Sequence, residues 1–181
     1  MRAASFDLET SNLNANFGII LCAVIKPFDG PCTILRGDSY RSWRKKRSDD
    51  SALCRDIRAE LERYDIWIAH NGTNFDIPFL RTRLMRTGER LAQPKIVDPV
   101  KLARRYLRLG YNSLEQVAAQ FGYYGKTKVE GRYWMEAVLD GSVEAMDYIV
   151  AHCVADVKLL EKVADKLGHL VPRIGNFGSD I

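Results

Sequence analysis

The sequence predicts an α/β fold in which a mixed sheet is flanked by helices. Three strand-like segments follow one another at the start of the chain, and shorter strands then alternate with amphipathic helices, the order expected for a sheet covered by helices. With 181 residues, of which 46% are hydrophobic, the chain can bury one full core. We therefore expect one domain, residues 1–171, followed by a C-terminal tail, residues 172–181.

The first part of the chain has the pattern of an antiparallel meander. The predicted strands are residues 5–10, 18–25 and 32–35. The second of these is a continuous apolar run, which is typical of a central strand covered on both faces. A glycine and a proline within residues 28–31 mark a turn, so neighbouring strands are expected to run in opposite directions.

The rest of the chain alternates helices with short strands. Apolar residues recur every four positions between residues 49 and 64, which predicts an amphipathic helix with acidic residues in its first turn. A serine followed three positions later by glutamine, beginning at Ser113, is the pattern of a helix N-cap. Short strands are expected at 66–69 and 96–98, and further helices at 77–87, 99–107, 113–121 and 142–167.

Composition and cysteine spacing disfavour several classes of protein. No apolar run is long enough to cross a bilayer and no signal peptide precedes the first strand, which predicts an intracellular, cytoplasmic protein with no membrane partner. The four cysteines include no C-x-x-C pair, so neither a zinc site nor a disulfide framework is indicated. The net charge of +4 is mild and suggests a polyanionic partner only weakly.

Two carboxylates lie close together on the first predicted strand. Alternation along a strand places Asp7 and Glu9 on one face and Phe6 and Leu8 on the other. Two like charges at this spacing raise each other's pKa unless a cation binds between them. The pair therefore indicates a metal site, although two unrelated acids on a solvated edge strand would give the same pattern.

Two further acids occupy positions suited to a ligand site. Asp76 lies between a strand and a helix, at the sheet edge where α/β folds bind ligands, and its alternative role is to cap that helix. Asp156 falls within the apolar face of the last helix, where a carboxylate is costly unless a cation meets it. His152 lies one turn earlier on the same side. Together they indicate a metal ligand beside a general base, and a histidine at the edge of the core is the alternative.

A basic segment containing aromatic residues spans residues 40–47. It includes, in succession, Trp43, Arg44, Lys45 and Lys46. Such a segment could hold a nucleic-acid backbone and stack bases, and the alternative is an exposed loop carrying a run of charge. Residues 123–134 again mix aromatic and basic side chains, which either line a substrate groove or pack on the surface.

Taken together, three segments resemble the motifs of the DEDD (DnaQ-like) superfamily of 3′→5′ exonucleases, which has an RNase H-like fold. Residues 6–10 (Phe-Asp-Leu-Glu-Thr) resemble its first motif, residues 71–76 (Asn-Gly-Thr-Asn-Phe-Asp) its second and residues 152–157 (His-Cys-Val-Ala-Asp-Val) its third. Each motif is weak alone, but three in the expected order and structural contexts are specific. The likeness is strongest to the proofreading domain of family-B DNA polymerases and related free-standing or phage-type nucleases.

The resemblance implies a mixed RNase H-like sheet and a metal-dependent hydrolase of nucleic acid. Two divalent cations would be held by four acids: Asp7, Glu9, Asp76 and Asp156. Oxygen ligands suit Mg²⁺ or Mn²⁺ better than Zn²⁺. By the same resemblance, four residues would lie near the terminal nucleotide: Leu8, Thr10, Asn71 and Phe75.

The implied substrate is the 3′ end of a single-stranded nucleic acid, from which nucleoside 5′-monophosphates would be released. DNA is favoured over RNA by the resemblance, although no residue is diagnostic for sensing a 2′-hydroxyl. A polymerase or a repair protein is the implied partner.

His152 departs from the pattern of the superfamily. One branch has tyrosine four residues before the last acid, and the other has histidine five residues before it. Here His152 occupies the tyrosine position, Ala151 occupies the histidine position, and Tyr148 is one turn too early. We expect His152 to orient or deprotonate the attacking water, because an imidazole has a pKa near neutrality.

Two other functions are compatible with the same residues. An RNase H-like or structure-specific endonuclease would use the same acids and cations, and a blocked 3′ end would separate it from an exonuclease. A non-catalytic nucleic-acid-binding subunit would depend on the basic segments, and Asp7→Ala would then leave its function intact. Asp98, which follows a short strand, is a weaker site candidate that matches no motif.

Overall fold

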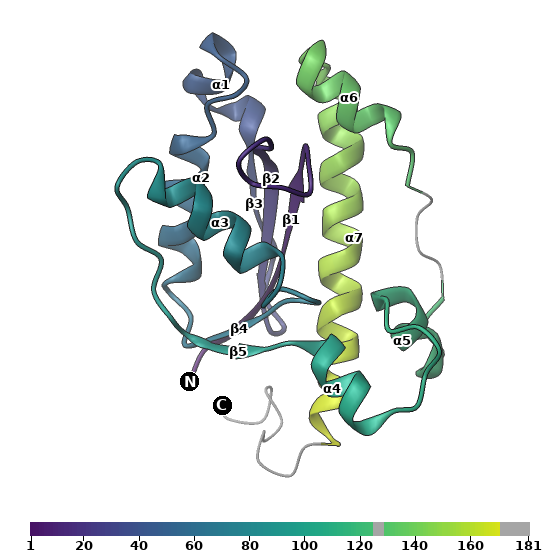
Figure 1. The fold of residues 1–181 in the computed structure, drawn as a ribbon. Coiled ribbons are helices and arrows are strands. Elements are labelled where there is room, and N and C mark those ends of the chain that lie inside the picture. The colour runs from purple at the N-terminus through teal and green to yellow at the C-terminus, as the bar shows by residue number, and fades with distance from the viewer. Residues whose placement is uncertain (125–128, 171–181) are drawn as a thin grey trace.

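The computed structural model describes residues 1–124 and 129–170, and it contains a five-stranded sheet in the order β3-β2-β1-β4-β5 (Figure 1). The strands are β1 (Ala3–Thr10), β2 (Ile20–Pro27), β3 (Thr33–Arg36), β4 (Ile66–Ile68) and β5 (Lys95–Val97). β1, β2 and β3 pair antiparallel, whereas β4 pairs parallel with both β1 and β5. The predicted α/β class and the antiparallel start of the sheet are therefore confirmed.

Helices connect these strands and cover the sheet. They are α1 (Arg41–Lys45), α2 (Ser51–Leu61), α3 (Asp76–Met85), α4 (Pro99–Tyr106), α5 (Leu114–Gln120), α6 (Arg132–Leu139) and α7 (Val143–Gly168), and a 3-10 turn, η1 (Gly37–Ser39), precedes α1. The predicted cap of α5 is confirmed, because Ser113 Oγ accepts from the backbone N–H of Gln116 at 3.3 Å. No helix within residues 1–124 and 129–170 combines the length and apolar character needed to cross a membrane.

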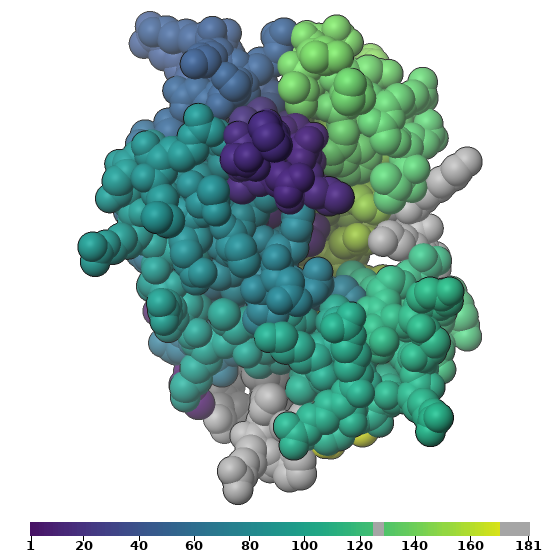
Figure 2. Space-filling view, viewed as in Figure 1, coloured from purple at the N-terminus to yellow at the C-terminus, as the bar shows by residue number. Residues whose placement is uncertain are grey.

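The sheet separates two layers of helices (Figure 1). Phe6 and Leu8 of β1 belong to a buried cluster that includes residues of α2 and α3. On the opposite face, Val24 of β2 packs in a second cluster with residues of α6 and α7. Asp7 and Glu9, which alternate with Phe6 and Leu8, therefore face α7. In the space-filling view, the loop between β1 and β2 lies on the surface between the α2–α3 layer and α6 (Figure 2).

Three features differ from the sequence-based expectations. The basic segment forms the short helix α1, and the mixed aromatic and basic segment contains the start of α6, and neither helix was predicted. The helix expected from residue 49 begins at Ser51, and it has no acid in its first turn because Asp49 and Asp50 precede it. The predicted tail, residues 172–181, lies outside the described residues, as do residues 125–128 of the second aromatic and basic segment.

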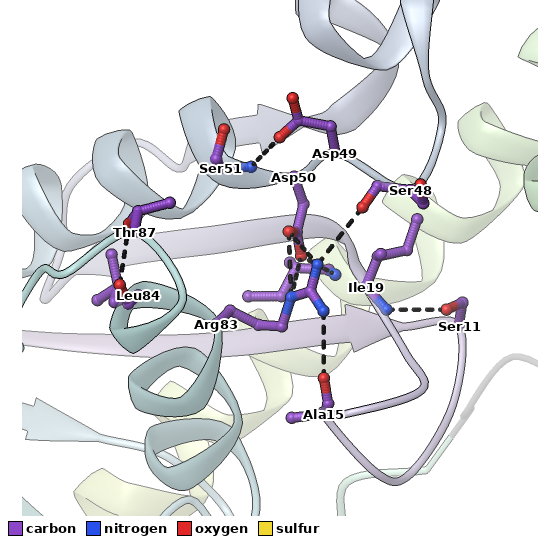
Figure 3. Close-up of polar contacts among 11 residues, drawn as sticks. Ser11, Ala15, Ile19, Ser48, Asp49, Asp50, Ser51, Arg83, Leu84 and Thr87 are labelled. Atoms are coloured by element: carbon purple, nitrogen blue, oxygen red, sulfur yellow. Dashed lines mark hydrogen bonds and ion pairs between the residues drawn. The ribbon is translucent and has the colours of Figure 1, made fainter.

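A buried ion pair fixes the loop that follows the acids of β1 (Figure 3). Arg83 of α3 donates to the Asp50 carboxylate at 2.6 Å and to the carbonyl of Ala15 at 3.2 Å. Asp50 also accepts from the backbone N–H of Ile20 at 2.8 Å. Because the bonds reach both the middle of the loop and the start of β2, the pair holds the β1–β2 loop against α2 and α3. A buried pair of charges is stable only when its hydrogen bonds are satisfied in this way.

Candidate active site

Two acids of the site come from the carboxyl half of β1. Asp7 and Glu9 are half-buried on the face that packs against α7. Their carboxylate oxygens and the sulfur of Cys153, on α7, lie within 4.8 Å of one another. The predicted alternation is confirmed, because Phe6 and Leu8 are buried on the other face of the sheet.

α7 contributes an imidazole and a third acid. His152 Nε2 lies 3.6 Å from Asp156 Oδ2 and 3.9 Å from Glu9 Oε1, so the ring stands between its own helix and β1. The ring of Trp134, on α6, packs edge-on against the imidazole with centroids 5.9 Å apart. The His152 side chain is only 7% exposed, so these neighbours restrict its orientation. The predicted placement of His152 and Asp156 on one side of the helix is confirmed.

The fourth acid, Asp76, is the first residue of α3 and points back to β1. Its Oδ1 accepts from the backbone N–H of Leu8 at 3.1 Å. The N-cap position of α3 belongs to Phe75, whose side chain forms no capping hydrogen bond. The alternative interpretation of Asp76 as a helix cap is therefore wrong, and its carboxylate lies beside the acids of β1.

The acids converge on Asp7. Burial raises the pKa of Asp7 well above its usual range, and the negative charges of Asp76, Glu9 and Asp156 raise it further. Burial also raises the pKa of Asp76 to about 7, although the hydrogen bond from Leu8 opposes this shift. Within the described residues, neither Asp7 nor Asp76 forms an ion pair with a lysine or an arginine. The ionised cluster is therefore stable only if cations bind to it.

A family model of the RNase H superfamily matches residues 4–168, which is most of the chain. The chain belongs to the RNase H superfamily. Among solved structures, it is similar to the family B DNA polymerase from the hyperthermophilic archaeon Pyrobaculum calidifontis, with a TM-score of 0.75 and 18% identity. The match covers 92% of this chain but only 24% of the polymerase chain, so the likeness concerns a shared fold. No curated protein sequence matches the chain.

Nucleases of the RNase H superfamily generally use divalent cations, and the residues of this site fit such ions. The four acids supply hard oxygen ligands, which Mg²⁺ and Mn²⁺ prefer. Cys153 Sγ lies 3.4 Å from Asp7 Oδ2, but burial raises the pKa of this thiol well above its usual range. We therefore interpret Cys153 as a neutral hydrogen-bond donor to Asp7 rather than as a thiolate ligand.

Asp98 supports the second motif rather than the acid cluster. Its buried carboxylate accepts from the backbone N–H groups of Asn71 and Thr73 at 2.9 and 3.3 Å, and from Thr73 Oγ1 at 2.6 Å. It also accepts from the N–H of Val100 at 3.1 Å and so caps α4. Asn71 has a φ of 64°, a left-handed conformation that these bonds help to hold. Sequence analysis did not predict this cap, although the proline after Asp98 could have indicated it, and nothing in the sequence indicated the bonds to the 71–73 loop.

We expect Asp98→Asn to lower the free energy of unfolding by about 2–4 kcal/mol, because the new amide nitrogen would face donors that now meet a carboxylate oxygen. Urea unfolding followed by circular dichroism measures the change. Thr73→Val removes one of these donors and should cost less, about 1 kcal/mol. An unchanged urea midpoint for Asp98→Asn would show that the carboxylate is not needed there.

Two of the residues expected near the substrate lie on β1. Thr10 ends the strand, and its Oγ1 donates to the carbonyl of Asn12 at 2.9 Å. The Leu8 side chain is buried in the core on the opposite face of the sheet. Any contact of Leu8 with a substrate must therefore come from its backbone.

The other two belong to the second motif. Asn71 is exposed, and its Oδ1 accepts from Asn74 Nδ2 at 2.9 Å. Phe75 is half-buried, and its ring lies 5.7 Å from that of Phe79. Phe75 directly precedes Asp76, whereas Asn71 lies five positions before it, in the loop that Asp98 holds.

In the basic segment, residues 40–47, the aromatic and the cationic side chains have different exposure. Trp43 is buried, with 3% exposure, and it packs so closely on Gly37 that a Cβ there would lie 2.7 Å from the indole. The indole is therefore not accessible to a base, which corrects the expectation that Trp43 stacks on the substrate. Arg44, Lys45 and Lys46 are exposed and remain available for contacts with a phosphate backbone.

The contacts that two residues, Cys153 and Trp134, make with the site were not predicted. Cys153 directly follows His152, but a cysteine on an apolar helix face gave no signal beyond core packing. Trp134 belongs to a helix that the sequence did not indicate, and its contact with His152 links residues of α6 and α7. Tyr148, which the spacing excluded as a site residue, stacks on Tyr133 with ring centroids 4.0 Å apart.

Proposed function

We propose that this protein is a metal-dependent 3′→5′ exonuclease that hydrolyses the terminal phosphodiester of a single-stranded nucleic acid. The observation that carries the proposal is the convergence of four acids, from β1, α3 and α7, beside a nearly buried imidazole. An acidic cluster repels a polyanion unless cations are bound, so this arrangement favours metal-assisted hydrolysis over simple binding.

Each group of the site would have a distinct role. Asp7, Glu9, Asp76 and Asp156 would hold two divalent cations, Mg²⁺ or Mn²⁺. Such ions, when bound, activate water and stabilise the charge on the leaving 3′ oxygen. His152 would accept the proton of the attacking water, since an imidazole beside carboxylates is an effective base near neutral pH. Trp134 would act as a positioning residue for this imidazole.

Cleavage from the 3′ end is supported by the three motifs. Thr10, Asn71 and Phe75 would bind the terminal nucleotide, and the products would be nucleoside 5′-monophosphates. DNA is favoured over RNA, because a solved structure with the same fold is a DNA polymerase. A polymerase or a repair protein is proposed as the partner on the same ground.

A time course with 5′-labelled single-stranded DNA and RNA 20-mers tests the proposal, with Mg²⁺, with Mn²⁺ and with a chelator. We expect a descending ladder that requires the metal, is stopped by a blocked 3′ end, and is faster on DNA. Asp156→Ala should remove the ladder, whereas Asp165→Ala, at a half-buried position near the end of the same helix, should retain it.

Two results would replace the proposal. Internal fragments from the 3′-blocked oligonucleotide would indicate an endonuclease. Binding without cleavage under every metal would indicate a nucleic-acid-binding subunit.

A further inference from the structure

A groove lies beside the candidate active site, between the η1–α1 segment and the start of α7. Its volume is about 620 Å³. The residues that shape it include Arg36, Trp43, Arg44, Arg47, Gly141 and Val143. None of these residues belongs to the acid cluster, so the groove is a separate feature of the surface.

The groove is basic. Residues 36–47 contain six arginines and lysines but only one acid, Asp38. Arg36 is largely neutralised, because it forms ion pairs with Asp38 at 2.7 Å and Asp147 at 2.6 Å. Arg44 is exposed, and its side chain has no ion pair or hydrogen bond within the described part of the chain. Among the residues that line the groove, Arg44 therefore carries a charge that no acid balances, and the exposed Lys45 and Lys46 follow it in the chain.

The walls of the groove are fixed by packing and hydrogen bonds. The buried Trp43 lies against Gly37, where no larger residue would fit without a shift. Arg47 donates to the carbonyls of Val138 and Leu139 at the end of α6, which ties α1 to α6. The cations of α1 are thus carried on a rigid support rather than on a free loop.

The groove lies on the same face of the sheet as the candidate catalytic acids, and at the same end of its antiparallel strands. Cys22 of β2 pairs in register with Glu9 on one side and with Arg36 on the other. Residues directly opposite one another in an antiparallel sheet point to the same face. Two strand spacings separate Glu9 from Arg36, a backbone distance of about 10 Å. This distance corresponds to one or two nucleotides of an extended strand.

We infer that this groove binds backbone phosphates of the nucleic-acid strand whose end occupies the acid cluster. The inference rests on the proposed exonuclease function and extends it, because it assigns a second contact one or more nucleotides from the bond that is cleaved. A row of exposed cations on a fixed wall suits a phosphodiester backbone, for which attraction is electrostatic and independent of sequence. Such a contact favours long substrates over the shortest ones.

The test is the double charge reversal Arg44→Glu/Lys45→Glu, which alters the exposed cation that lines the groove and the one that follows it on α1. In a chelator, which prevents cleavage, fluorescence anisotropy with a single-stranded DNA 20-mer should show at least tenfold weaker binding. The slope of log K against log salt should fall by about 1.4, the value for two lost phosphate contacts on a single strand. The loss in kcat/KM with Mg²⁺ should be at least tenfold larger for the 20-mer than for a dinucleotide, whose single phosphate cannot reach the groove.

The matched control is Arg90→Glu/Lys95→Glu, which makes the same change in charge near the amino end of β5. This control should bind the 20-mer as the unaltered protein does. Equal affinities of the two double variants for the 20-mer, with cleavage intact, would contradict phosphate binding in the groove but would not contradict the exonuclease function. If Arg44→Glu/Lys45→Glu lost binding but the unaltered protein shortened no substrate, phosphate binding in the groove would be supported and the exonuclease function would be contradicted.

Discussion

Asp76→Asn is expected to lower kcat of oligonucleotide cleavage by about 10³-fold while raising the melting temperature of the metal-free protein at pH 8 by about 5 °C. The expected loss of activity follows from our proposal that the charged oxygens of Asp76 help to hold a cation. The gain in stability follows because the amide has no charge to bury, and its oxygen can still accept from the N–H of Leu8, which now lies 3.1 Å from Asp76 Oδ1.

The stability of the unaltered, metal-free protein should also depend on pH, because the carboxyl of Asp76 is buried. Burial raises the pKa of Asp76 to about 7 in the folded protein, above the value near 4 expected for an unfolded chain. The folded state therefore binds more protons than the unfolded state between these two values, and stability is lost as the pH rises through this range. The pKa of Asp7 is shifted in the same direction, so the metal-free protein should melt at a lower temperature at pH 8 than at pH 5.

Thermal melts in chelator at pH 5 and pH 8, with and without excess Mg²⁺, measure these effects. The difference in melting temperature between Asp76→Asn and the unaltered protein should be smaller at pH 5, where the Asp76 carboxyl of the unaltered protein is protonated. Mg²⁺ should stabilise the unaltered protein most at pH 8 and should stabilise Asp76→Asn much less. Asp98→Asn is the matched control, because it changes an equally buried acid that already has its hydrogen-bond donors, and it should destabilise at both pH values. A lower melting temperature for Asp76→Asn at pH 8 would contradict a metal-holding role for Asp76.

The contrast between Asp76 and Asp98 shows how far the sequence could specify the site. Both acids stand between a short strand and a helix, and local rules assign the same capping role to each. Asp98 does cap its helix, whereas Asp76 bonds to Leu8, a residue 68 positions earlier. The pairing of β1 with β4 and the packing of α3 against β1 bring these two segments together, so no local pattern could separate the two roles.

The periodicity of the sequence correctly predicted those parts of the site that depend on a single strand or helix. Asp7 and Glu9 share a face because strand side chains alternate, and His152 and Asp156 share a side because they are four residues apart in a helix. Trp43 illustrates the limit of the same approach. Its cationic neighbours suggested a stacking surface, but its burial depends on close packing against Gly37, which the local pattern does not reveal.

His152→Ala is expected to lower kcat by about 10²–10⁴-fold, the usual contribution of a general base, with a much smaller change in KM. The reason is geometric: the imidazole lies 3.6 Å from Asp156 and 3.9 Å from Glu9, within the acid cluster and not at the groove that we assign to the backbone. Single-turnover cleavage of the DNA 20-mer measures the rate. Added imidazole should restore part of it, because a small base can enter the space left by the side chain.

Two further variants separate a catalytic role for His152 from a structural one. His169→Ala removes a histidine that also pairs with an acid four residues away, Asp165, but at the exposed end of α7, and it should leave the rate unchanged. His152→Tyr places in the site the residue that the tyrosine branch of the resembled exonucleases carries at this spacing, and it should retain more activity than His152→Ala. If His152→Ala kept its kcat and only its KM rose, the imidazole would bind substrate, and the proton of the attacking water would have to leave by another group of the cluster.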